Sequence, residues 1–112
     1  MAKHEIDLRR YSTEGVKLLS LRPRGLEVRD AAGLNEIDRE LRTDPEATVV
    51  IKIPNYIVRI TSSFFLGMLG DSIRNLESYE GFQERFTFEG HYSEKALRSA
   101  ASEALKWGSV FV

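Results

Sequence analysis

The stretch VVIKIPNYIVRITSSFFLGML, residues 49–69, passes from one structural pattern to another. Its beginning belongs to TVVIKI (48–53), a run of β-branched residues that predicts a strand covered on both faces. A Pro-Asn pair interrupts the run, and YIVRI (56–60) then leads into a helix that we expect at 61–77. A strand that turns into a helix at three consecutive hydroxyl residues is therefore the centre of the predicted fold.

The rest of the chain alternates between strand-like and helix-like segments. The periodicity of the apolar residues predicts further strands at 5–8, 16–21 and 85–88, and further helices at 30–42 and 93–107. Asp30 is expected to cap the first helix, and the last four residues, SVFV, fit either a short edge strand or a docked tail. Strands separated by helices pair in parallel, whereas the first two strands are expected to form a hairpin. We predict one α/β domain over residues 1–112, a mixed β-sheet with amphipathic helices packed on it.

The composition is that of an ordinary globular domain. The 112 residues carry a net charge of -1 and no cysteine, which excludes disulfides and thiolate metal sites. The near-neutral charge gives no general attraction to nucleic acid. The first residues are charged and lack the apolar core of a secretory signal, and no apolar run reaches the roughly 20 residues that span a bilayer. We therefore expect a cytoplasmic protein. The basic segment LRPRGLEVR (21–29) is interpreted as a solvated turn rather than a phosphate-binding patch.

The helix expected at 61–77 carries two different stripes on a helical wheel. The first stripe is apolar and is assigned to the core: Phe65, Leu66, Leu69, Ile73 and Leu76. The second stripe lies beside it and consists of Ser63, Gly67, Gly70 and Arg74, while Phe64 and Met68 are predicted to point away from the core. Each glycine costs a helix about 1 kcal/mol relative to alanine, so a close neighbour is expected at the second stripe. That neighbour is either the helix at 30–42 or a partner protein anchored on Phe64 and Met68.

The three hydroxyls at the start of this helix raise a separate question. Either Thr61 or Ser62 can accept a hydrogen bond from the free amides as the N-cap, a contribution of about 1 kcal/mol. Ser63 then lies inside the first turn, where a phosphate would place about -1.5 to -2 charges at the favourable end of the helix dipole. Arg59 and Arg74 are candidates to pair with such a phosphate or with an acidic partner. Ser63 is therefore the first candidate for phosphorylation, with Ser62 and Thr61 as alternatives.

Other chemistry finds less support in the sequence. The two histidines, His4 and His91, are far apart, whereas a metal site needs three or four convergent ligands. Ser63 and His91 could pair as nucleophile and base, but the sequence has no nucleophile elbow. We therefore predict no catalytic residue, no metal site and no cofactor.

Residues 49–69 also resemble the central strand-turn-helix of the STAS domain, the fold of bacterial anti-sigma factor antagonists. The family has Asp-Ser-Ser-Gly-Leu-Gly where this chain has TSSFFL (61–66), so Ser63 matches the serine that a partner kinase phosphorylates. The segment RGLEVRDAAGLNEIDREL (24–41) brings the chain closer to the STAS-like domain of unknown function, and the resemblance covers about residues 16–90. The chain departs from the family at Thr61 and Phe64, in place of aspartate and glycine, and at Lys52, in place of an acidic residue.

The resemblance implies a non-enzymatic regulatory domain that binds a protein partner, either a histidine-kinase-like ATPase or a serine kinase. Ser63 would be the switch, surrounded by the partner-binding residues Arg59, Phe64, Gly67, Met68, Gly70 and Arg74. One alternative is a nucleotide-binding or small-anion-binding module that uses the same helix amides. Another is a homodimer or larger homo-oligomer in which Phe64 and Met68 are buried between copies.

Overall fold

The computed structural model describes the backbone of residues 2–110 and gives an α/β fold with parallel strands. Strands β1 (Lys3–Asp7), β3 (Thr48–Lys52) and β5 (Phe86–Glu89) form one sheet in the order β1-β3-β5. Strands β2 (Leu18–Leu19) and β4 (Arg59–Ile60) form a separate two-stranded ribbon. All three pairings are parallel. The expected hairpin between the first two strands is therefore wrong, and the described residues form no antiparallel pair.

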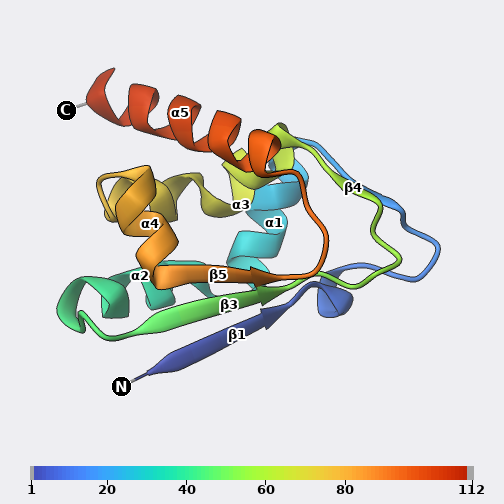
Figure 1. Cartoon of the computed structure of the whole chain (residues 1–112), viewed down its shortest axis with the longest axis horizontal. Helices are drawn as coiled ribbons and strands as arrows, with labels where there is room; N and C mark the ends of the chain where they lie inside the picture. Colours follow the sequence, from blue (N-terminus) through green and yellow to red (C-terminus); the bar gives the residue numbers. More distant parts are fainter. Residues whose placement is uncertain (1, 111–112) are drawn as a thin grey trace.

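The helices fill the space on one side of the three-stranded sheet. They are α1 (Arg22–Ala31), α2 (Leu34–Thr43), α3 (Ser62–Asn75), α4 (Tyr79–Arg85) and α5 (Glu94–Val110), with a 3₁₀ turn, η1, at Leu8–Tyr11. Figure 1 shows the three strands side by side, α5 on the opposite side of the molecule and α3 between them. Val49 and Ile51 of β3 are buried, but Val50 and Lys52 on its other face are only half-buried. The prediction that this strand is covered on both faces is therefore wrong.

Most of the predicted helices occur, with changed bounds. The helix expected at 61–77 is α3, and the one expected at 93–107 is α5, whose buried face includes Leu97, Ala100, Ala101 and Ala104. At the start of α5, the hydroxyl oxygen of Ser93 accepts a hydrogen bond from the amide of Ala96 at 3.1 Å. Of the SVFV segment, residues 109 and 110 continue α5, and 111 and 112 lie outside the described residues.

The segment expected to be a turn followed by the helix 30–42 is in fact two helices. The basic segment forms α1, and Asp30 lies inside that helix instead of capping the next one. The chain then turns at Gly33, whose φ of 71° is a left-handed conformation that glycine adopts without strain. α2 follows, with Leu34 and Leu41 buried. The short α4 was not predicted; Ser78 caps it by accepting a hydrogen bond from the amide of Gly81 at 2.9 Å.

The closest packing in the fold is the crossing of α1 and α3. A Cβ built on Gly67 of α3 would lie 2.1 Å from the carbonyl oxygen of Arg22, and one on Gly25 of α1 would lie 2.2 Å from that of Phe64. Both distances are far shorter than carbon and oxygen tolerate, so the two backbones touch through paired glycines. The helix that covers the glycine face is thus α1, where we expected the helix at 30–42 or a partner.

This contact predicts a large effect of one methyl group. Gly67→Ala should lower the free energy of unfolding by about 3 kcal/mol, because the new Cβ meets backbone atoms that cannot rotate away. Gly15→Ala is the matched control, since nothing lies within 4 Å of its Cβ, and it should change stability by less than about 0.5 kcal/mol. Urea denaturation followed by circular dichroism measures both. Equal stability of the two variants would contradict the crossing.

Candidate functional site

The two-stranded ribbon brings the starts of two helices together. β2 and β4 run in parallel with Leu18 opposite Arg59 and Leu19 opposite Ile60, and the amide of Thr61 donates to the carbonyl of Leu19 at 3.0 Å. α1 begins three residues after β2 ends, and α3 begins two residues after β4 ends. Both helix N-termini therefore lie at the same end of the ribbon, the carboxyl end, where α/β folds place their binding groups.

The hydroxyl triplet lies at the start of α3, as predicted. Thr61 is the N-cap: its backbone is extended, and its side-chain oxygen accepts from the amide of Phe64 at 3.3 Å. Ser62 is half-buried, whereas Ser63 is exposed to solvent in the first turn. Of the three candidate phosphorylation sites, Ser63 is therefore the most accessible hydroxyl, and Thr61 is engaged in capping.

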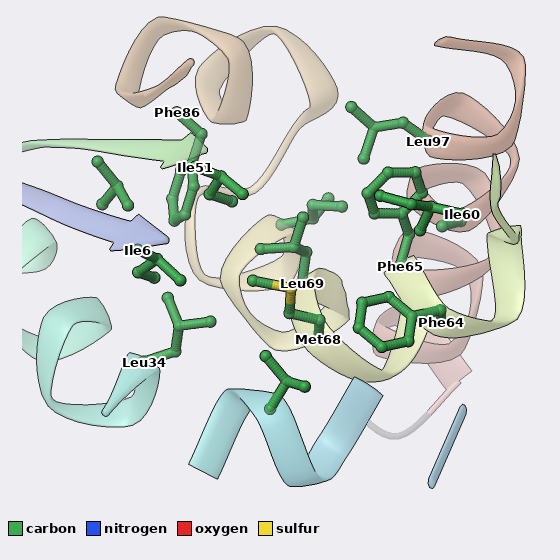
Figure 2. Packing of buried hydrophobic residues seen from close by; sticks show 14 of the residues in the cluster. Ile6, Leu34, Ile51, Ile60, Phe64, Phe65, Met68, Leu69, Phe86 and Leu97 are labelled. Atoms are coloured by element: carbon green, nitrogen blue, oxygen red, sulfur yellow. The ribbon is translucent and has the colours of Figure 1, made fainter. Parts of the chain in front are cut away.

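The predicted outward orientation of Phe64 and Met68 is wrong. Phe64 is 0% and Met68 1% exposed, and Figure 2 shows both side chains among those of the core. The helical wheel assumed that α3 packs on one side only. In the structure α3 lies between α1 and α5, so most of its circumference is covered. These two residues therefore cannot anchor a partner or a second copy on the surface of the folded chain.

The glycine stripe is also closed by the protein itself. α1 covers Gly67, and a Cβ on Gly70 would lie 3.7 Å from the Cβ of Ala104 on α5. Arg74 donates to the carbonyl oxygen of Ala104 at 3.2 Å and pairs with Asp71, so it joins α3 to α5. At 1.5 Å per residue it lies about 16 Å along the helix from Ser63, too far to hold a phosphate there. Of the predicted partner-binding residues, Arg59 and Ser63 are the exposed ones.

Exposed apolar side chains lie around the ribbon, where none was expected from the sequence. The exposed large apolar residues of the described chain are Leu18, Leu21, Leu26 and Val58, with exposed fractions of 49%, 66%, 45% and 65%. All four belong to the segments around the ribbon and the start of α1. We call Lys17, Leu18, Leu21, Arg22, Val58, Arg59 and Ser63 the ribbon surface. Its sequence signal was the run LLSL before Arg-Pro, in which successive leucines cannot all face one core.

Leu21 is the strained member of this surface. Its φ of 75° and ψ of 133° lie in a region that favours glycine, and among the described non-glycine residues Glu77 alone shares a positive φ. Such a conformation costs about 1–3 kcal/mol. Leu21 is also the N-cap position of α1, and its side chain makes no capping hydrogen bond. A strained leucine that remains in solvent is a mark of a functional segment.

A buried polar network lies away from the ribbon, between α1, α2 and α3. Arg29 of α1 pairs with Asp38 of α2 and donates at 3.0 Å to both the hydroxyl of Ser72 and the carbonyl of Met68 on α3. The hydroxyl of Ser72 in turn donates to Asp38 at 3.1 Å. Arg29, which we expected in a solvated turn, is therefore buried in this network, and that expectation is wrong. The network holds three helices in register, a structural role.

The remaining titratable groups give no catalytic arrangement in the described part of the chain. His4 pairs with Glu40, His91 is exposed and makes no hydrogen bond with Ser63, and the residues described hold no cluster of three potential metal ligands. The pKa of Asp7 is lowered because the amide of Arg9 donates to its carboxylate. Burial raises the pKa of Tyr79. Neither group belongs to the ribbon surface.

Comparison of the chain with protein-family models, with curated proteins and with solved structures gave no match. The resemblance to STAS domains therefore stays a prediction from the sequence. Among the helices that the structure describes, none has the length and apolarity to cross a membrane.

The stability of alanine variants distinguishes the capping hydroxyl of Thr61 from the exposed hydroxyl of Ser63. Thr61→Ala should lower the free energy of unfolding by about 1 kcal/mol, because the amide of Phe64 loses its capping oxygen. Ser63→Ala should change it by less than about 0.5 kcal/mol, because its side chain is exposed. Thermal and urea unfolding of both variants test this. A larger loss for Ser63→Ala than for Thr61→Ala would show that the cap is misassigned.

Proposed function

We propose that this chain is a non-enzymatic regulatory domain of the STAS-like kind. It binds a kinase-type or ATPase-type protein partner at the ribbon surface, and Ser63 is the position at which phosphorylation switches that contact. The observation that carries the proposal is that the ribbon and the start of α1 hold the exposed large apolar side chains of the described residues, and the ribbon leads directly into the one exposed hydroxyl of the triplet. Apolar patches on a soluble domain mark contacts with other molecules.

The local electrostatics support Ser63 as the switch. A phosphate there would lie in the first turn of α3, beside free backbone amides and the positive end of the helix dipole. Two arginines lie near the helix starts: Arg59 in β4, just before α3, and Arg22, the first residue of α1. Both are exposed, and neither pairs with an acidic side chain in the part of the chain described. The phosphate would thus be stabilised by the domain while it changes the charge of the ribbon surface by about two units.

The proposal retains only part of the binding surface first expected. Arg59 and Ser63 stay in it, while Phe64, Gly67, Met68, Gly70 and Arg74 leave it because the folded chain covers or engages them. Leu18, Leu21 and Val58 replace Phe64 and Met68 as the apolar anchors. Hydrophobic anchors ringed by polar groups are the usual arrangement of a protein contact.

A kinase assay tests the switch. The chain is incubated with ATP and a histidine-kinase-like ATPase or serine kinase encoded beside its gene, and the phosphate is mapped by mass spectrometry. We expect label on Ser63 and none in Ser63→Ala, whereas Ser62→Ala should be labelled like the unchanged chain. Label on Thr61 or Ser62 alone would contradict the assignment of the switch. The kinase neither binding nor labelling the chain would overturn the proposed function.

A second candidate function follows from the paired helix starts. α1 and α3 both present their first amides at the carboxyl end of the ribbon, an arrangement that can hold a nucleotide or another small anion. Isothermal titration with ATP, GTP and inorganic phosphate distinguishes the two functions. Micromolar binding of a nucleotide that Arg59→Gln abolishes, in a chain that no kinase binds, would favour the anion-binding module.

A further inference from the structure

We infer that the outer edge of β2 receives an extended acidic segment of the partner protein as an added strand. The inference rests on the proposed function in one respect, that the occupant of the ribbon surface is a protein. It adds the mode of binding and the chemistry of the partner segment. Four features of the structure lead to it: an unpaired strand edge, a groove along that edge, exposed leucines and an excess of positive charge.

The edge of β2 is open on the side away from β4. The carbonyls of Lys17 and Leu19 accept hydrogen bonds from β4, from the amides of Val58 at 2.7 Å and Thr61 at 3.0 Å. Backbone groups alternate in direction along a strand, so the N–H and C=O of Leu18 and Ser20 point to the other edge. Within residues 2–110, β4 is the one strand that pairs with β2. A strand edge of this kind is a template for a further strand.

A groove of about 370 Å³ runs along this open edge. One of its walls is the β2 segment, from Leu18 to Leu21, and the other sides come from η1 and from the first turns of α1. Its lining is largely apolar: Tyr11, Val16, Leu18, Leu19, Leu21 and Pro23. An added strand sends alternate side chains to opposite faces, so one set can enter such a groove while the other stays in solvent.

Leu18 and Leu21 flank the edge and stay exposed in the free chain. Leu21 does so in a backbone conformation that glycine would adopt without strain. The fold itself therefore draws little from the side chain of Leu21, which suits an anchor for a partner. Burial of both leucines against an added strand would remove apolar surface that the chain leaves in water.

The charge around the groove selects the partner. Residues 11–27 and 56–63, which include the lining of the groove, contain four basic side chains and two acidic ones, Glu14 and Glu27, in a chain whose net charge is -1. Glu27 is paired with Arg24 at 3.3 Å, so Lys17, Arg22 and Arg59 carry the positive excess. Lys17, Arg22 and Arg59 are exposed. A second copy of the chain would bring the same positive excess to the contact, and like charges disfavour that pairing. An extended acidic segment, by contrast, is attracted to the positive charge around the groove.

Two short peptides test the inference on the full chain. One is a fluorescein-labelled octapeptide of alternating valine and glutamate, and the other has lysine in place of glutamate. At low salt we expect the acidic peptide to bind at least tenfold more tightly by fluorescence anisotropy. In ¹⁵N NMR spectra it should shift the amides of Leu18 and Ser20 and slow their hydrogen exchange, because these two groups pair with the added strand.

Two glycine substitutions form a matched pair. Leu21→Gly and Glu77→Gly each replace an exposed residue of positive φ, so each should raise the urea midpoint of unfolding. Leu21→Gly should weaken binding of the acidic peptide at least fivefold, because the anchor is lost from a chain that folds better. Glu77→Gly, at the far end of α3, should leave binding unchanged.

The outcomes separate this inference from the proposed function. Equal binding of the two peptides, or shifts confined to other amides, would overturn strand addition while the kinase assay on Ser63 could still succeed. Protection of the Leu18 amide without peptide, together with a dimer in analytical ultracentrifugation, would identify a second copy as the occupant and overturn the inference. Peptide binding with no phosphorylation of Ser63 would leave strand addition standing and remove the switch.

Discussion

The contact on which the structure depends is the backbone crossing of α1 and α3 at Gly25 and Gly67. A side chain at either position would push the helices apart, because carbonyl oxygens of the opposite helix occupy the space of the missing Cβ atoms. Both crossing points lie within two turns of the helix starts. The crossing therefore fixes the two N-termini beside each other, and the short strands that lead into them pair as a consequence. The ribbon surface exists because two glycines allow this approach.

The burial of α3 follows from the same contact. With α1 against one side and α5 against another, side chains that a one-sided helix would expose become part of the core, Phe64 and Met68 among them. Arg29 of α1 donates to Ser72 of α3 and forms a buried ion pair with Asp38 of α2. These directional contacts restrict how the helices can pack at an otherwise apolar interface. Removing one partner of such a pair leaves a charge without compensation, which typically costs 3–5 kcal/mol. Geometry and electrostatics thus hold α1 in one position on α3.

The sequence predicted the elements whose patterns are local. The β-branched run of β3, a hydroxyl cap at Thr61 or Ser62 and the helix α5 each depend on residues close together in the chain. α1 could not be recognised in this way, because Pro23 and Gly25 are typical of turns and their helical role depends on a partner helix distant in sequence. Strand pairing failed for the same reason: a short separation suggested a hairpin, whereas β1 and β2 pair with strands more than forty residues away in the chain. In the candidate site, Ser63 and Arg59 could be found from the helix start, but the exposed leucines could not, since their exposure is decided by tertiary packing.

The ribbon surface joins a hydroxyl and a strand edge, and the two would act against each other. In the proposed contact, an acidic segment would be attracted to β2 by the positive excess carried by Lys17, Arg22 and Arg59. A phosphate on Ser63 would add about two negative charges at the start of α3. This helix start lies next to β2, because the amide of Thr61 donates a hydrogen bond to the carbonyl of Leu19. That charge would offset most of the excess that attracts the segment, and it would compete for the same arginines. Phosphorylation at α3 would therefore release a strand bound at β2 without any change in the fold, a switch that needs only the electrostatics of one surface.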